Sequence, residues 1–127
     1  PLPGAVEAVT RLKAAGLAVG VVTSDNVERT VASMELAGLP ASVWDFVLGA
    51  ESVPRHKPAP DMIHRAAEQT GIAPEAFAVV GDSRVDMMMA KSAGALAVGV
   101  RELGRASAGV EELADVVLDG VYEIRVP

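Results

Sequence analysis

The sequence contains no cysteine and very few aromatic residues. Its 127 residues include one Trp, one Tyr and two Phe. Without cysteine, the chain has no disulfide, no thiolate nucleophile and no cysteine-based zinc site. With so few aromatic side chains, it offers little surface on which nucleic-acid bases could stack. Any core must therefore be built from Ala, Val, Leu, Ile and Met, a composition typical of helices packed on a sheet.

Basic residues and long apolar runs are also scarce. The chain carries 11 Lys and Arg against 17 Asp and Glu, a formal net charge of −6. Binding of nucleic acid depends on clustered Lys and Arg, so we expect no nucleic-acid partner. No apolar run approaches the roughly 20 residues needed to cross a bilayer, and no signal peptide is visible. We therefore expect a cytoplasmic protein with no membrane partner.

Helix-like and strand-like segments alternate along the chain. Apolar residues at helical spacing, often ended by glycine, predict helices over 3–16, 25–38, 58–71, 83–94 and 110–115. Short apolar runs predict strands over 17–23, 44–50, 77–82, 95–100 and 116–120. This order predicts a single α/β domain over 1–127, with a Rossmann-like three-layer α/β/α core around a mostly parallel sheet.

Small polar residues follow the first predicted strand, and a lysine lies in a later loop. In such sheets, ligands bind beyond the carboxyl ends of the strands. Thr23 and Ser24 offer hydroxyl and backbone N–H groups that can hold a phosphate oxygen, although an ordinary helix cap is favoured on these residues alone. Lys57 precedes a proline that favours an extended backbone, which can direct its ammonium at a phosphoryl group. A solvated basic loop is the alternative for Lys57.

Two aspartates four residues apart stand at the end of the predicted strand 77–82. Mg²⁺ prefers hard oxygen ligands, commonly one or two carboxylates with waters and a substrate phosphate. Asp82 is therefore a candidate direct ligand. Asp86 faces the same side of the following helix and could bind through water or orient Lys57. Capping by Ser83, with Asp86 near the positive helix end, is an alternative of similar weight.

The order of these segments resembles that of the haloacid dehalogenase superfamily. The match is closest to its phosphoglycolate phosphatase-like and β-phosphoglucomutase-like branch. It rests on VVTSDN, RHKPAPD and VVGDSRVDMMMAKSAGA, and runs over nearly the whole chain. The resemblance implies a phosphatase that acts on a small phosphorylated metabolite with Mg²⁺ as its cofactor.

The resemblance also implies a role for each candidate residue. In the family, the residue matching Thr23 binds the transferring phosphoryl group, and the lysine matching Lys57 neutralises its charge. The aspartate matching Asp82 is a Mg²⁺ ligand, with Asp86 in support. We expect the phosphoryl group to be bound by Thr23, Ser24, Asp25 and Lys57.

One element of the family pattern has no match in this chain. The family's Asp-x-Asp motif ends an N-terminal strand and supplies the aspartate that attacks phosphorus and a second that acts as acid and base. In the family, this strand lies between those matching 17–23 and 77–81. We therefore expect an incomplete core that lacks the central nucleophile strand and the helical cap, and no turnover by this chain alone. The unpaired strand edges predict a missing N-terminal segment or self-association.

Other functions fit part of the pattern. A phosphomutase of the same family would share every candidate residue, and a non-catalytic binding module would lack the nucleophile. The dehalogenase branch works without metal and has less use for the two aspartates. A receiver-type phosphoacceptor domain needs an acidic pair near its first strand, which the chain lacks. We favour the phosphatase.

Overall fold

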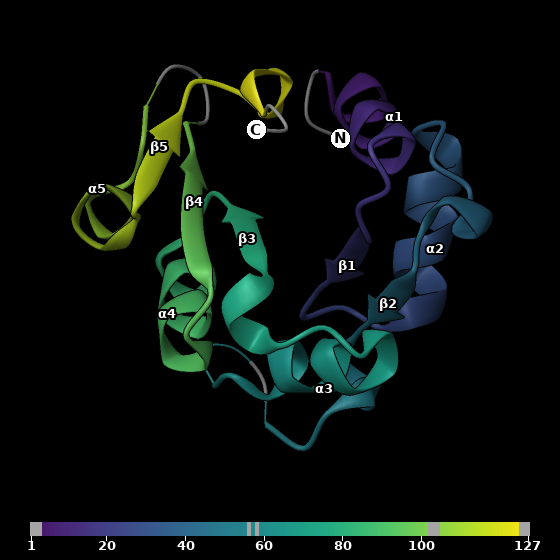
Figure 1. Cartoon of the computed structure of the whole chain (residues 1–127), viewed down its shortest axis with the longest axis horizontal. Helices are drawn as coiled ribbons and strands as arrows, with labels where there is room; N and C mark the ends of the chain where they lie inside the picture. The colour runs from purple at the N-terminus through teal and green to yellow at the C-terminus, as the bar shows by residue number, and fades with distance from the viewer. Residues whose placement is uncertain (1–3, 56, 58, 102–104, 125–127) are drawn as a thin grey trace.

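The computed structural model describes residues 4–55, 57, 59–101 and 105–124 as alternating helices and strands (Figure 1). The α-helices are α1 (Ala5–Ala14), α2 (Val27–Leu36), α3 (Asp61–Thr70), α4 (Arg84–Ala93) and α5 (Ala108–Leu113). The strands are β1 (Gly20–Val22), β2 (Phe46–Leu48), β3 (Ala78–Gly81), β4 (Leu96–Val100) and β5 (Val116–Leu118). Short 3₁₀ turns add η1 (Ala41–Val43), η2 (Ala50–Ser52), η3 (Pro74–Ala76) and η4 (Val121–Glu123). Every predicted helix and strand is present, and no described helix is long and apolar enough to cross a membrane.

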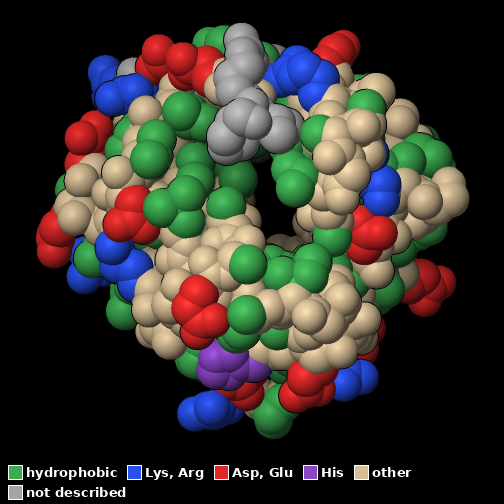
Figure 2. Space-filling model, viewed as in Figure 1, with side chains coloured by type: hydrophobic (Ala, Val, Ile, Leu, Met, Phe, Trp, Pro, Cys, Tyr) green, Lys and Arg blue, Asp and Glu red, His purple; other side chains and the backbone are tan. Residues whose placement is uncertain are grey.

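All observed strand pairs are parallel, as predicted, but they form two separate sheets. One sheet has the order β1-β2 and the other the order β3-β4-β5. Within the described ranges, no ladder joins β1 to β3. Figure 1 shows these two strands on opposite sides of an opening, and Figure 2 shows a hollow at the same place with apolar side chains around it. The sheet is therefore interrupted where the family pattern places a further strand.

Helix ends follow ordinary capping chemistry. The side chains of Asn26, Ser83 and Ser107 each accept a hydrogen bond from the backbone N–H three residues further on. Gly71 and Gly94 end α3 and α4 with φ of 73° and 79°, a left-handed conformation that favours glycine. These caps satisfy backbone groups that a helix cannot pair internally.

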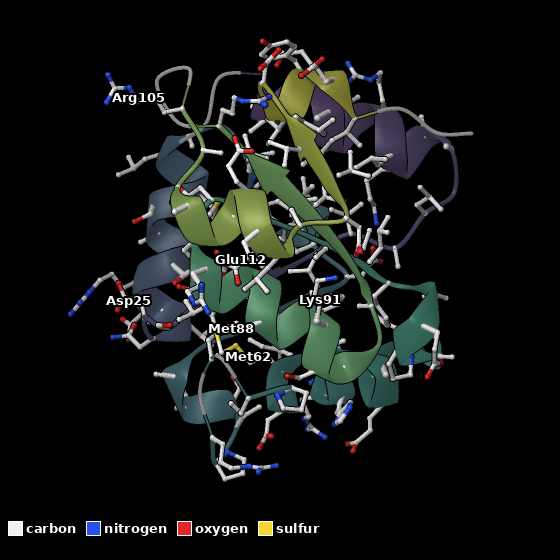
Figure 3. All side chains as sticks on the ribbon, turned by 90° about the vertical axis from the view of Figure 1, so that its left-hand side faces the viewer. Asp25, Met62, Met88, Lys91, Arg105 and Glu112 are labelled. Atoms are coloured by element: carbon white, nitrogen blue, oxygen red, sulfur yellow. The ribbon has the colours of Figure 1, made fainter. Side chains whose placement is uncertain are left out.

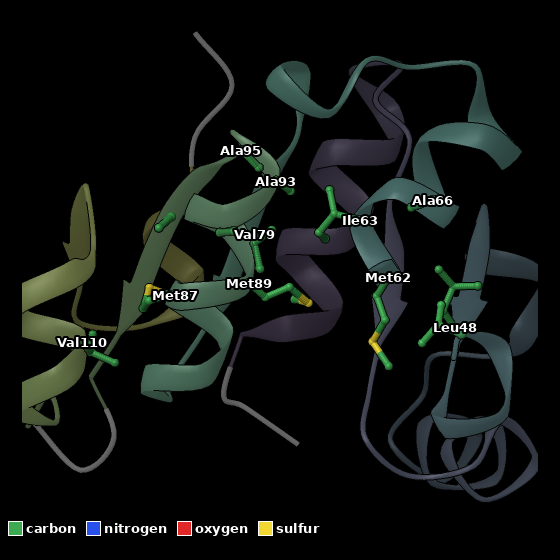
Figure 4. Packing of buried hydrophobic residues seen from close by; sticks show 13 residues of the cluster. Leu48, Met62, Ile63, Ala66, Val79, Met87, Met89, Ala93, Ala95 and Val110 are labelled. Carbon is green, nitrogen blue, oxygen red and sulfur yellow. The ribbon is translucent and has the colours of Figure 1, made fainter. Parts of the chain in front are cut away.

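The core is built from aliphatic side chains and methionine, as the composition predicts. Met62, Met87 and Met89 are fully buried between α3, α4 and the strands, and Leu48 of β2 joins the same cluster (Figure 4). The α3 helix contacts both β2 and α4, so it connects the two sheets through the core.

One face of the β3-β4-β5 sheet is covered only in part. Helices α4 and α5 contact these strands, and Gly99 of β4 lies directly against Val110 of α5. The strand register places Val80, Val98 and Val116 together on the other face. Val80 is 41% exposed and Val116 44%, unusual for strands of a parallel sheet, whereas Val98 between them is only 8% exposed. The exposed part of this face, at β3, adjoins the hollow of Figure 2.

A lysine–aspartate clamp joins the start of β1 to the start of β2. Asp45 accepts a hydrogen bond from the Val19 N–H at 2.7 Å and pairs with Lys13 Nζ at 2.9 Å. The Asp45 N–H donates in return to the Val19 carbonyl at 2.8 Å. The hydrogen bonds from Lys13 and then from Val19 lower the pKa of Asp45 below its ordinary value.

The same clamp recurs between β4 and β5. Asp115 accepts from the Ala97 N–H at 2.8 Å and pairs with Lys91 Nζ at 3.0 Å, while its own N–H donates to the Ala97 carbonyl. The hydrogen bonds from Ala97 and then from Lys91 lower the pKa of Asp115. In each sheet, a lysine ammonium, an aspartate carboxylate and a backbone N–H thus fix the strand register near the N-terminal ends of the strands.

Helix α1 meets the C-terminal turn η4 and closes the molecule into a ring. The Arg11 guanidinium donates to the backbone carbonyls of Tyr122 and Ile124, both at 3.1 Å. In Figure 1 this joint lies across the opening from α3. The two sheets are therefore linked on one side by α3 and on the other by α1 and η4.

Candidate active site

The turn after β1 presents a hydroxyl and a backbone N–H. The Thr23 N–H donates to the Leu48 carbonyl at 2.9 Å, which continues the β1-β2 ladder. The Thr23 Oγ1 accepts the Asp25 N–H at 3.2 Å, so its own proton can be donated elsewhere. Ser24 is exposed, and no described residue accepts its N–H. These two residues can therefore offer donors to an anion.

The Asp25 side chain is turned toward α2. Its Oδ1 accepts the Asn26 N–H at 2.8 Å and lies 3.2 Å from Arg29 Nη1. Figure 3 shows Asp25 at the periphery, beside the first turn of α2. The carboxylate stabilises the start of this helix, and in this arrangement it adds no donor to the turn.

Lys57 and Asp86 form a largely buried ion pair. Lys57 Nζ lies 2.7 Å from Asp86 Oδ1, and the two side chains are 12% and 14% exposed. The Ser83 hydroxyl donates to Asp86 Oδ2 at 2.7 Å, and Ser83 Oγ accepts the Asp86 N–H at 3.3 Å. Asp86 therefore contacts both Lys57 and Ser83, and Ser83 also caps the helix.

Gly81 allows this cluster to sit against the end of β3. A Cβ at position 81 would lie 2.6 Å from Asp86 Oδ2 and 2.7 Å from Asp86 Cβ. Only glycine leaves room for the carboxylate at this distance. A glycine before Asp82 is thus needed for the Asp86 side chain to pack against the end of β3.

Asp82 is the carboxylate at this strand end that has no ion pair with any described residue. It is exposed and immediately follows β3. Among the described residues, no three Asp, Glu or His side chains lie close enough together to enclose a metal ion. Since Asp86 is paired with Lys57, the part of the chain that is described offers Asp82 as one open carboxylate. This fits Mg²⁺ only if further oxygen ligands come from phosphate, water or other residues.

The candidate residues form two groups. Thr23 and Ser24 lie on the β1 side of the opening, and Lys57, Asp82 and Asp86 lie with α4 and β3 on the other. Within the described ranges, no hydrogen bond or ion pair joins the groups. Both groups lie beyond the carboxyl ends of parallel strands. A ligand between the groups would meet the donors of Thr23 and Ser24 on one side and Lys57 and Asp82 on the other.

Comparisons with known proteins identify the family to which the sequence is similar. Residues 1–94 match the family model of the haloacid dehalogenase-like hydrolases. The sequence is 42% identical over 98 residues to a Dickeya dadantii protein named probable phosphatase IndB, and 37% identical over 100 residues to the phosphoglycolate phosphatase of Neisseria meningitidis. These matches cover 77% and 79% of this chain and 42% of each relative, so the chain spans less than half their length.

Solved structures show the same fold. A hydrolase of this family from Deinococcus radiodurans, crystallised with phosphate and sodium, has a TM-score of 0.89 at 30% identity and covers 98% of this chain and 57% of its own. A predicted phosphoglycolate phosphatase from Haemophilus somnus has a TM-score of 0.86 at 26% identity over 96% of this chain and 54% of its own. The three-layer, Rossmann-like prediction is confirmed.

Proposed function

Because the chain belongs to the haloacid dehalogenase-like hydrolase family, we propose that it forms the core of a Mg²⁺-dependent phosphatase that acts on a small phosphorylated metabolite. The observation that carries this proposal is the buried Lys57–Asp86 pair beside Asp82. A buried charge pair costs desolvation and is weak support for stability alone. Its place at the carboxyl end of β3 supports a role in binding a charged group.

Each residue of the site has a proposed task. Thr23 and Ser24 donate hydrogen bonds to phosphoryl oxygens, and Lys57, held by Asp86, neutralises the charge that develops on them. Asp82 would hold Mg²⁺, which when bound supplies a Lewis acid for the phosphoryl oxygens. The Asp25 side chain stabilises the start of α2, and its place among the phosphoryl-binding residues stays a prediction.

The nucleophile comes from outside this chain in the proposal. A strand between β1 and β3 would carry an aspartate whose carboxylate attacks phosphorus, with the substrate alcohol as leaving group. Water then hydrolyses the aspartyl-phosphate, which releases phosphate and restores the carboxylate. The open edges of β1 and β3 and the exposed Val80 support this placement. On this proposal, 1–127 is an incomplete core that does not turn over alone.

Turnover of p-nitrophenyl phosphate tests the proposal. The chain is compared with the protein extended by its natural upstream coding sequence, with and without Mg²⁺. We expect turnover only from the extended protein, its loss on chelation, and its loss in Asp82→Asn but not in the exposed control Glu35→Gln. An extended protein with neither an Asp-x-Asp strand nor turnover would support the binding module instead. Sedimentation of both forms shows whether a second copy, instead of the upstream strand, pairs with the open edges.

A further inference from the structure

Glu51 lies on the turn after β2 and reaches across to the turn after β1. Its carboxylate accepts the Val27 N–H, with Oε1 at 3.1 Å and Oε2 at 3.3 Å. Beside it, the Ala50 N–H donates to the Asp25 carbonyl at 2.8 Å. A side-chain bond and a main-chain bond thus fasten the two turns together.

The packing between these turns is tight. A Cβ on Gly49 would lie 2.6 Å from the Asp25 carbonyl oxygen, 2.7 Å from Glu51 Oε1 and 2.9 Å from the Val27 nitrogen. The Gly49 N–H donates to Ser52 Oγ at 2.9 Å, which closes the turn on its own side. The turn after β1 therefore rests on a fixed surface made by residues 49–52.

Glu51 also occupies the start of α2. The first N–H groups of a helix lack internal partners, and the positive helix end attracts anions. In α2 the Val27 N–H is taken by Glu51, and the Arg29 N–H by the Asn26 side chain. The Val27 and Arg29 N–H groups are therefore not free to bind an anion, whereas the Thr23 hydroxyl can still donate a hydrogen bond.

We propose that Glu51 is a positioning residue for phosphoryl binding. It holds the turn 23–26 against the end of β2 and takes up the Val27 N–H at the start of α2. The phosphoryl oxygens are thereby directed to Thr23 and Ser24. Glu51 itself does not touch the substrate in this scheme, and the inference rests on the proposed function. Because the Glu51 carboxylate is exposed, its hydrogen bond with the Val27 N–H adds little to stability. Its effect in this scheme is to fix the position of the turn.

The test compares Glu51→Ala with Glu51→Gln in the extended protein. Gln keeps an oxygen that can accept the Val27 N–H, whereas Ala does not. Glu28→Ala is the control, since Glu28 is an exposed acidic residue in the same first turn of α2. Inorganic phosphate is the probe, and its inhibition constant is measured against p-nitrophenyl phosphate.

We expect Glu51→Ala to raise the phosphate inhibition constant and KM by about fivefold to tenfold with a smaller change in kcat, and Glu51→Gln to stay within about threefold of wild type. A merely structural role would lower the melting temperature and leave the inhibition constant unchanged. Hydrogen exchange over residues 23–28 should be faster in Glu51→Ala than in Glu51→Gln.

The outcomes separate the two proposals. If the extended wild-type protein turns over but Glu51→Ala matches Glu28→Ala in its inhibition constant, the inference is wrong and the proposed function stands. Equal exchange rates in the Ala and Gln variants would also overturn it. If the extended wild-type protein neither turns over nor binds phosphate, the proposed function fails and the inference fails with it.

Discussion

Breaking the buried Lys57–Asp86 pair should destabilise the protein much more than breaking the exposed Lys91–Asp115 pair. The two pairs have the same chemistry and similar lengths, 2.7 and 3.0 Å. They differ in exposure, which is 12% and 14% for the first pair and 43% and 38% for the second. Burial is the main difference between the pairs, since each carboxylate also accepts one further hydrogen bond, from Ser83 in one case and from Ala97 in the other.

The expected magnitudes follow from the distances. Two unit charges 2.7 Å apart attract by about 6 kcal/mol at an effective dielectric of about 20, whereas water screens the attraction between Lys91 and Asp115. Desolvation offsets much of the value for the buried pair. We expect a coupling energy of about 2–3 kcal/mol for Lys57 with Asp86 and a much smaller one for Lys91 with Asp115.

Two double-mutant cycles measure these energies. Lys57→Met, Asp86→Asn and the double variant form one cycle, and Lys91→Met, Asp115→Asn and their double variant form the control. The free energy of unfolding of each is taken from urea denaturation. Equal coupling in the two cycles, or a buried coupling below about 1 kcal/mol, would refute the reasoning from burial.

Three further predictions concern stability. The pKa values of Asp45 and Asp115 are lowered by their hydrogen bonds, so the stability they contribute is present above the ordinary value of 3.8 and is lost as pH falls through the lower folded value. Asp45→Asn or Asp115→Asn should therefore flatten the fall in melting temperature below about pH 4. Gly81→Ala should cost about 1–3 kcal/mol, because its Cβ displaces Asp86, and an unchanged urea midpoint would contradict this. Met62→Ala should cost about 2–5 kcal/mol in the same assay, since Met62 is fully buried.

The helices and strands could be predicted because their signals are local. Apolar spacing and stop glycines located every helix and strand, but they did not fix the ends. The predicted strand 17–23 shortens to Gly20–Val22 because its partner begins at Phe46, and the Asp45 side chain takes the Val19 N–H. Strand ends depend on the neighbouring strand, which no local pattern contains.

The repeated clamp shows a signal that could have been found in the sequence. KAAGLAVGVV at 13–22 and KSAGALAVGV at 91–100 are similar. Each begins with the lysine that pairs with an aspartate just before the next strand. The spacing between lysine and aspartate differs, 32 residues in one case and 24 in the other, which conceals the correspondence until the strands are paired.

For the candidate site, the sequence pattern proposed residues but not the contacts that they make. The sequence pattern selected Lys57, Asp82 and Asp86, and it offered the orientation of Lys57 as one role for Asp86. It did not show that Asp25 turns toward α2. No role was assigned to Glu51, because its partner Val27 lies 24 residues away and the bond depends on how two turns pack. The direction of an exposed side chain is decided by such tertiary contacts.

The ring formed by α3 on one side and by α1 with η4 on the other sets the separation of the two sheets. A strand that pairs with both β1 and β3 would lie inside this ring, between α3 and the joint that Arg11 fastens to η4. Because the ring is closed at both ends of the opening, the space for such a strand depends on contacts that lie far from the site. Loss of the two Arg11 hydrogen bonds would let β1 and β3 move relative to each other.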